Sequence, residues 1–148
     1  MIEFPILGWI FFLKEEESIK TPIPNCGKWM YFFNRAGANF ADEICKKAVQ
    51  EGVVEESKHT DINLLSIDTG VCCFYIDGTD TEAHKRVLKF FLENGMIPRN
   101  KNGNLRNISF KFDKETRANE YGSDFHAKIK LSHFVDLKTG EFLKKRIW

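Results

Sequence analysis

The chain has 148 residues, of which 43% are hydrophobic and 14% aromatic, and its formal charge is +1. This composition is typical of a folded protein and excludes collagen-like, low-complexity and intrinsically disordered chains. A domain of this length buries roughly 70% of its unfolded surface, so a disulfide or a metal is not needed for folding. No Pro/Gly/Ser-rich linker divides the sequence, which predicts a single α+β domain over residues 1–148.

The N-terminal third predicts two strands and a helix. Residues 6–13 (ILGWIFFL) are rich in β-forming residues and stop at a charged run, as a buried strand does. Residues 26–33 (CGKWMYFF) predict a central strand packed on both faces, because both alternating sets of side chains are bulky. A helical period then begins at Asn39, which can cap the helix, and Gly52 suits its end. The apolar face of this helix comprises Phe40, Ile44, Ala48 and Val49.

The middle of the chain repeats this pattern. Residues 53–60 predict a weaker strand, and residues 70–77 (GVCCFYID) predict the clearest buried strand. The segment from Thr79 to Glu82 has the spacing of a capping box, and the helix that follows ends at Gly95. Its apolar residues are Val87, Leu88, Phe90, Phe91 and Met96.

The C-terminal third predicts strands with one dry and one wet face. Residues 107–112 and 123–131 alternate apolar and polar side chains, which is typical of antiparallel sheets. Residues 135–142 predict a hairpin that turns near Lys138–Gly140. The expected order is β-β-α-β-β-α-β-β-β, a curved, mostly antiparallel α+β sheet with two helices packed on one face.

Several of these features resemble the cap-binding translation initiation factor 4E family. The residues that carry the likeness are Gly27-Lys28-Trp29-Met30, which open a strand ahead of the first helix, and the strand–turn–helix unit of residues 70–95. The likeness spans residues 27–112 and implies a 4E-like fold. In that family two tryptophans on loops stack on the cap, but the matching loops, residues 14–26 and 59–70, contain no Phe, Tyr or Trp. Stacking contributes about 1–3 kcal/mol per base, so the resemblance implies the fold without cap binding.

Positive charge is concentrated near the C-terminus. Residues 1–98 hold 10 Lys/Arg and 15 Asp/Glu, whereas residues 99–148 hold 12 and 6. If the two C-terminal strands pair, their polar sides form a basic face that could attract phosphate groups. The candidate nucleic-acid or anion-binding residues are Arg106, Lys111, Arg117, His126, Lys128 and Lys130. The sequence therefore predicts a non-enzymatic binding protein for nucleic acid or another anionic ligand. The alternative is that these residues form an ordinary solvated face with interspersed carboxylates and bind no ligand.

Two other functions are open at this point. A protein-interaction or inhibitory module without a small ligand could use residues 6–13 as a sheet edge and Trp148 as an anchor. A metal-independent ribonuclease-like activity could use His126 and His133 as acid and base, with Lys128 stabilising the transition state. The odd spacing of the two histidines sends them to opposite faces of a regular strand.

The cysteines and the N-terminus indicate the compartment. The four cysteines lack CxxC spacing, and Cys72 and Cys73 face opposite sides of a strand, so buried free thiols are expected. His84 could approach one of them, but two ligands do not make a zinc site, and a helix-surface histidine is the expectation. The apolar N-terminus has no basic leader segment and is too short to cross a bilayer. We therefore expect a cytoplasmic protein with no cofactor, no metal and no membrane partner.

Overall fold

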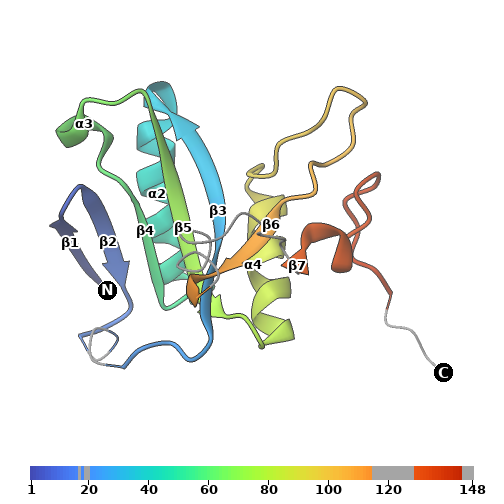
Figure 1. The fold of residues 1–148 in the computed structure, drawn as a ribbon, viewed down its shortest axis with the longest axis horizontal. Helices are drawn as coiled ribbons and strands as arrows, with labels where there is room; N and C mark the ends of the chain where they lie inside the picture. Colours follow the sequence, from blue (N-terminus) through green and yellow to red (C-terminus); the bar gives the residue numbers. More distant parts are fainter. Residues whose placement is uncertain (17, 19–20, 115–128, 145–148) are drawn as a thin grey trace.

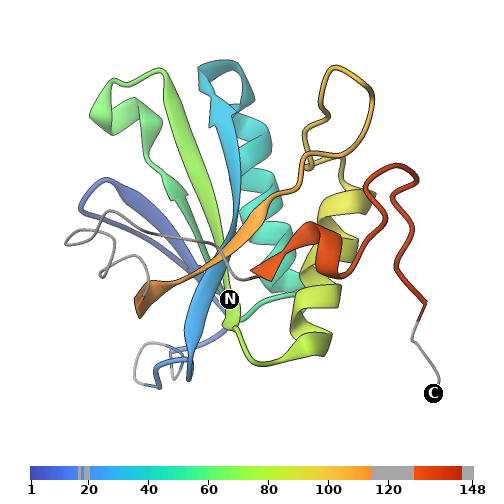
Figure 2. The same cartoon turned by 45° about the vertical axis from the view of Figure 1, so that its right-hand side comes forward.

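The computed structural model describes residues 1–16, 18, 21–114 and 129–144. A seven-stranded sheet has the order β1-β2-β4-β5-β3-β6-β7, and every neighbouring pair is antiparallel. Two helices of 13 residues each, α2 and α4, lie on the same side of this sheet (Figures 1 and 2). The predicted α+β architecture is confirmed. The strands are β1 (Ile2–Ile6), β2 (Trp9–Leu13), β3 (Cys26–Asn34), β4 (Glu56–Thr60), β5 (Thr69–Asp77), β6 (Ser109–Phe112) and β7 (Ile129–Lys130), and the α-helices are α2 (Ala38–Gln50), α3 (Ile62–Leu65) and α4 (Thr81–Glu93).

The apolar N-terminal segment forms a hairpin, so the prediction of one strand over residues 6–13 was wrong. β1 and β2 are joined by a two-residue turn in which Leu7 has φ 48° and Gly8 has φ 86°. Positive φ at both turn residues matches the twist of a tight hairpin. Hydrophobic periodicity does not reveal the turn, because Leu7 is apolar and Gly8 lies between two runs of β-forming residues. β1 is consequently the edge strand of the sheet (Figure 1).

β3 is central, as predicted, but only its helix-facing side is well packed. Trp29 and Phe33 are buried there, whereas Phe32 on the other side is 70% exposed. Gly27 permits the close crossing of β6, since a Cβ at this position would lie 2.5 Å from the Phe110 ring. The expectation of a strand packed on both faces was therefore wrong, because the helices cover one side of the strand and Phe32 on the other side is exposed.

The N-terminal caps of the two helices differ by two residues and one residue from the predicted caps. A 3-10 turn, Arg35–Gly37, precedes α2, and the Asn34 side chain caps that turn, so Asn39 lies inside the helix. At α4 the capping side chain is Asp80, which accepts a hydrogen bond from the Ala83 backbone, in place of the predicted Thr79. Short polar side chains compete for such positions, and tertiary packing selects among them. Gly52 and Gly95 follow the two helices with positive φ, as expected.

The remaining segments are shorter than predicted. β4 begins at Glu56, and the polar stretch after it contains the four-residue helix α3. Most of the predicted strand 123–131 lies outside the described residues, and its described end forms β7 and a 3-10 turn, Leu131–His133. The predicted hairpin 135–142 is present as a single bridge between Val135 and Phe142. None of the described helices has the length and apolarity that a membrane crossing requires.

Candidate anion-binding face of the sheet

Four lysines lie on the side of the sheet that faces away from α2 and α4. Trp29 and Phe110 contact His84 of α4, so their strand neighbours Lys28 and Lys111 point to the opposite side. Cross-strand partners share a face, and Lys28 is paired with Lys111 in the register of β3 and β6. The register also places the other two lysines on this side. Lys58 is paired with Cys73, which is paired with Met30, a residue on the same side of β3 as Lys28. Lys130 is paired with Ser109, which lies on the same side of β6 as Lys111. We call this surface, defined by Lys28, Lys58, Lys111 and Lys130, the lysine face.

Aromatic rings surround one of these lysines. The Lys58 ammonium lies 3.8 Å from the ring centroid of Trp9, 5.3 Å from that of Phe11 and 5.8 Å from that of Tyr75. The same Tyr75 ring is also a neighbour of Lys28, whose ammonium lies 5.8 Å from the ring centroid. Such cation–π contacts each contribute about 0.5–1 kcal/mol at exposed sites and more where water is excluded. Two of the four lysines on this face, Lys28 and Lys58, therefore lie near aromatic rings.

Burial perturbs the charged groups on this face. Burial lowers the pKa of Lys58 and raises the pKa of its strand neighbour Glu56. Lys28 forms an ion pair with Asp113 at 3.3 Å, and the lysine side chain is 16% exposed. Asp77, the register partner of Cys26, shares this side with Glu56 and Asp113, so four lysines lie here with three of the described carboxylates. An anion that replaces lost water at Lys58 would stabilise its charged form.

The thiols on this side are not nucleophiles. Burial raises the pKa of Cys73 to about 11, and burial together with Asp113 raises that of Cys26 to about 12. The thiolate is the reactive form, so both cysteines are protonated at neutral pH. The expectation of free thiols agrees with the structure, in which Cys26, Cys45, Cys72 and Cys73 are all unpaired.

The structure brings together only part of the predicted basic face. Lys111 and Lys130 do share one side of the sheet. Arg106 is exposed in the loop before β6, where its backbone N–H bonds Pro98. Arg117, His126 and Lys128 lie outside the described residues.

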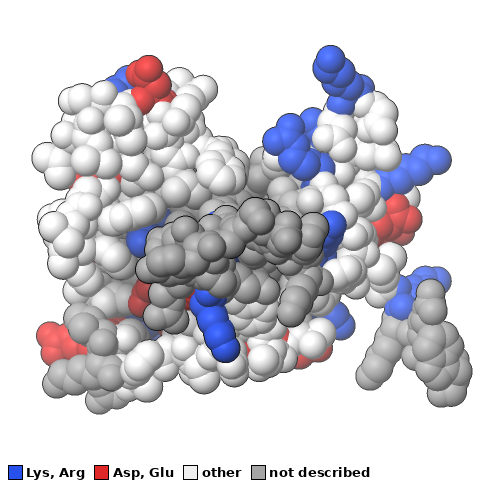
Figure 3. Space-filling view, in the orientation of Figure 1, with Lys and Arg blue, Asp and Glu red and all other residues white. Residues whose placement is uncertain are grey.

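Sequence reasoning missed Lys28 and Lys58 as members of this face. Strand parity separates Lys28 from Trp29, and that signal was available. The pairing of Lys28 with Lys111, 83 positions away, was not, because local periodicity carries no information on strand order. In Figure 3 Lys and Arg side chains gather mainly at the right of this view and a few are visible near its centre, while the upper left, near the β1–β2 turn and α3, is mostly uncharged.

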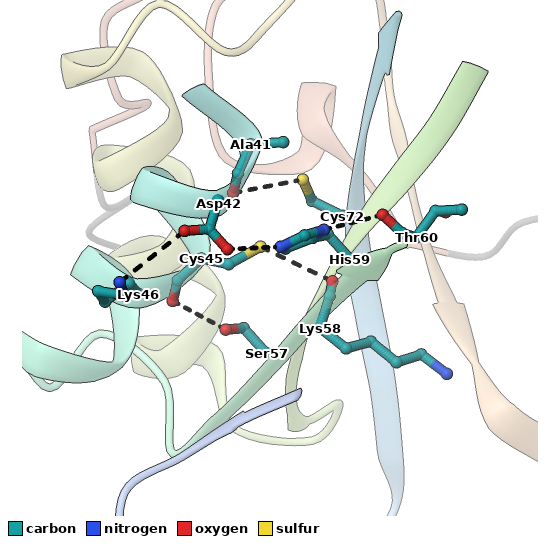
Figure 4. Close-up of polar contacts among 9 residues, drawn as sticks. All are labelled: Ala41, Asp42, Cys45, Lys46, Ser57, Lys58, His59, Thr60 and Cys72. Carbon is teal, nitrogen blue, oxygen red and sulfur yellow. Dashed lines mark hydrogen bonds and ion pairs between the residues drawn. The ribbon is translucent and has the colours of Figure 1, made fainter. Parts of the chain in front are cut away.

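A polar cluster under the sheet contains His59 and two thiols (Figure 4). The ring of His59 contacts the Asp42 carboxylate through Nε2 and the Thr60 carbonyl through Nδ1, both at 2.9 Å. Both ring nitrogens are therefore engaged by neighbouring oxygen atoms. The nearby Cys45 thiol is directed at the Lys58 carbonyl, 3.7 Å away. Neither ring nitrogen is left to activate a thiol, and the cluster joins α2 to β4 structurally.

His84 is a core residue, which corrects the expectation of a helix-surface histidine. It is 2% exposed, accepts a hydrogen bond from Trp29 Nε1 at 3.0 Å and donates one to the Gly78 carbonyl at 2.9 Å. The neutral ring with its proton on Nε2 satisfies both, and burial lowers the pKa. His84 therefore has no free nitrogen for a metal. Within the described part of the chain, no three His, Cys, Asp or Glu residues are grouped as metal ligands.

The predicted acid–base pair cannot be assembled from the described residues. His133 is exposed, and its Nδ1 accepts a hydrogen bond from the Lys130 backbone at 3.2 Å. His126 and Lys128 lie outside the described residues. The ribonuclease-like activity stays a prediction.

A cleft of about 680 Å³ lies at one end of the sheet, between the loop after β2 and the start of α4. Its rim is mainly acidic, and the Arg86 Nε group there already donates to the Val53 carbonyl at 2.9 Å. Such a rim disfavours a phosphate-bearing ligand. The charged residues that line the cleft are Lys14, Glu15, Glu55, Asp77, Asp80 and Arg86.

Comparison with known proteins returned no family model, no curated protein and no solved structure that matches this chain. The likeness to the initiation factor 4E family therefore stays a prediction based on the residues quoted for it.

Proposed function

We propose that this chain is a non-enzymatic binding protein with a 4E-like fold that holds a phosphate-bearing ligand, a nucleic acid or a nucleotide, on the lysine face. One observation carries the proposal: lysines from β3, β4, β6 and β7 share one side of the sheet. Like charges repel when they are gathered on one surface, so the arrangement favours a ligand that supplies negative charge. The acidic cleft offers no such match.

The proposal predicts a defined salt dependence. Each lysine–phosphate contact with a single strand releases condensed counterions and adds about 0.7 to the slope of log affinity against log salt. If all four lysines engage phosphates, the slope approaches roughly −3. Binding should thus weaken steeply between low and physiological salt.

The test compares two double variants with equal loss of charge. Lys111→Gln/Lys130→Gln removes charge from the lysine face, and Lys85→Gln/Lys89→Gln removes it from exposed positions on α4, on the other side of the sheet. Fluorescence anisotropy with a labelled single-stranded oligonucleotide should show a reduced affinity and a shallower salt slope in the first variant alone. Equal losses in both variants would mean that only net charge matters, and the proposal would be wrong.

A protein-interaction module is the second candidate function. Three apolar side chains at the β1–β2 turn and α3 favour it, since Leu7 is 94%, Leu64 68% and Leu65 47% exposed. Backbone pairing of a partner strand with the edge of β1 is limited. The register of the tight hairpin directs the backbone nitrogen of Pro5 away from β2, and proline has no N–H to donate to a partner. Sedimentation velocity of the pure protein, with and without Leu7→Asp, tests self-association through this corner. A monomer that still binds oligonucleotides would favour the first proposal.

A further inference from the structure

Aromatic residues lie beside the lysines, along one margin of the same side of the sheet. Phe4 and Phe11 are cross-strand partners whose rings stack at 5.3 Å with an interplanar angle of 7°. Trp9 is two residues from Phe11 and therefore points to the same side. All three side chains are half-buried, so part of each ring is accessible. Together they form an aromatic strip over β1 and β2.

The strip adjoins the lysines directly through Lys58. The Lys58 ammonium lies over the Trp9 ring at 3.8 Å, and β4, which carries it, pairs with β2. The remaining lysines lie on β3, β6 and β7, and the charge therefore extends from Lys58 on β4, across β5, β3 and β6, to Lys130 on β7. Neighbouring strands are about 4.8 Å apart, which spreads this charge over roughly 19 Å. A flat apolar margin followed by a row of cations matches the two chemical parts of a nucleotide chain, the base and the phosphates.

We propose that the aromatic strip stacks an unpaired nucleobase on Trp9 while Lys58 moves from the Trp9 ring to an adjacent phosphate, so that the ligand of the lysine face is a single-stranded nucleic acid. Proteins that bind single strands combine stacking on aromatic side chains with a cationic surface that follows the backbone. A duplex buries its base faces in its own stack and cannot use the strip. This inference rests on the proposed function, since the phosphates are held by the lysines.

The experiment separates base recognition from phosphate recognition. Oligonucleotides of about eight nucleotides are compared in four forms: oligo(dT), oligo(U), an abasic strand with the same number of phosphates, and a duplex. The wild-type protein should bind the base-bearing single strands about tenfold or more tightly than the abasic strand. Quenching of tryptophan fluorescence should accompany binding of the base-bearing strands only. The oligo(dT) and oligo(U) arms distinguish DNA from RNA as the preferred ligand.

Variants of Trp9 assign the preference to the strip. Trp9→Leu should remove the preference for bases and leave abasic binding unchanged, and Trp9→Phe should retain most of it because a ring is kept. Phe142→Leu is the matched control, since it removes a partly exposed ring from the distant C-terminal hairpin. Circular dichroism establishes whether each variant is folded. If Trp9→Leu does not fold, the comparison of Trp9→Phe with the wild-type protein still tests the inference.

The outcomes separate the two proposals. Equal affinity for abasic and base-bearing strands, with loss of both in the lysine variant, would overturn the stacking inference and leave the proposed function standing. A base preference that survives in Trp9→Leu, or equally tight duplex binding, would also overturn the inference. No measurable binding of any probe at low salt would overturn both.

Discussion

The buried histidine on α4 leads to a specific expectation for stability against pH. His84 accepts a hydrogen bond from Trp29 Nε1 at 3.0 Å and donates to the Gly78 carbonyl at 2.9 Å. Protonation of Nδ1 would replace the acceptor that Trp29 needs with a second donor and would place a charge in the core. Burial accordingly lowers the pKa of His84 in the folded state.

The lowered pKa of His84 sets the sign of the effect. Below the ordinary histidine pKa of about 6.5 the unfolded chain binds a proton that the folded chain refuses, so the free energy of unfolding falls as the pH falls. The contribution is fully present above pH ~6.5 and declines by at most about 1.4 kcal/mol per pH unit below it, until the folded pKa is reached. Between about pH 7.5 and 5.5 this amounts to a loss of up to roughly 1.4 kcal/mol.

Urea unfolding at several pH values, followed by circular dichroism, measures this loss. His84→Gln is the informative variant, because an amide can still accept and donate but does not titrate in this range. The wild-type protein should lose more stability than His84→Gln as the pH is lowered, while His133→Gln, at an exposed histidine, should follow the wild type. A pH-independent difference between wild type and His84→Gln, or one of opposite sign, would refute the reasoning.

Two further predictions concern Glu56 on the lysine face and Gly27 of β3. Glu56→Gln removes a carboxylate whose pKa is raised by burial, so we expect unchanged or higher stability at neutral pH. We also expect about two- to threefold tighter oligonucleotide binding at low salt, because a negative charge is removed from the lysine face. Fluorescence anisotropy measures this change, and Glu82→Gln on α4 is the control. Weaker binding in Glu56→Gln would argue against an anionic ligand. Gly27→Ala should destabilise the fold by about 1–3 kcal/mol because its Cβ would meet the Phe110 ring at 2.5 Å. Gly37→Ala, whose Cβ would have no neighbour closer than 3.7 Å, should cost less in the same urea titration, and equal losses would contradict the steric argument.

Local patterns were sufficient for the elements and for part of the candidate site. The apolar run at residues 70–77 lies within β5, and the opposite orientation of Cys72 and Cys73 follows from strand parity alone. The two helices follow from their 3.6-residue periods, which also indicate most of the faces they bury; the exception is Phe40, predicted on the apolar face of α2 but 37% exposed. Alternation in the C-terminal third correctly placed Lys111 and Lys130 on one side of the sheet.

Tertiary structure decided the rest, because the decisive contacts join residues far apart in the sequence. The bond between Trp29 and His84 spans 55 positions, and it converts a polar helix residue into a core residue. Strand order places Lys28 beside Lys111, and the hairpin at Gly8 folds the aromatic strip back toward Lys58. Periodicity specifies which side of its own strand a residue occupies, but not which strand lies next to it. That choice depends on how the whole core packs, so the sequence by itself determined most elements and the side of the strand for Lys111 and Lys130, whereas the tertiary structure determined the β1–β2 hairpin and which strands bring the lysines together.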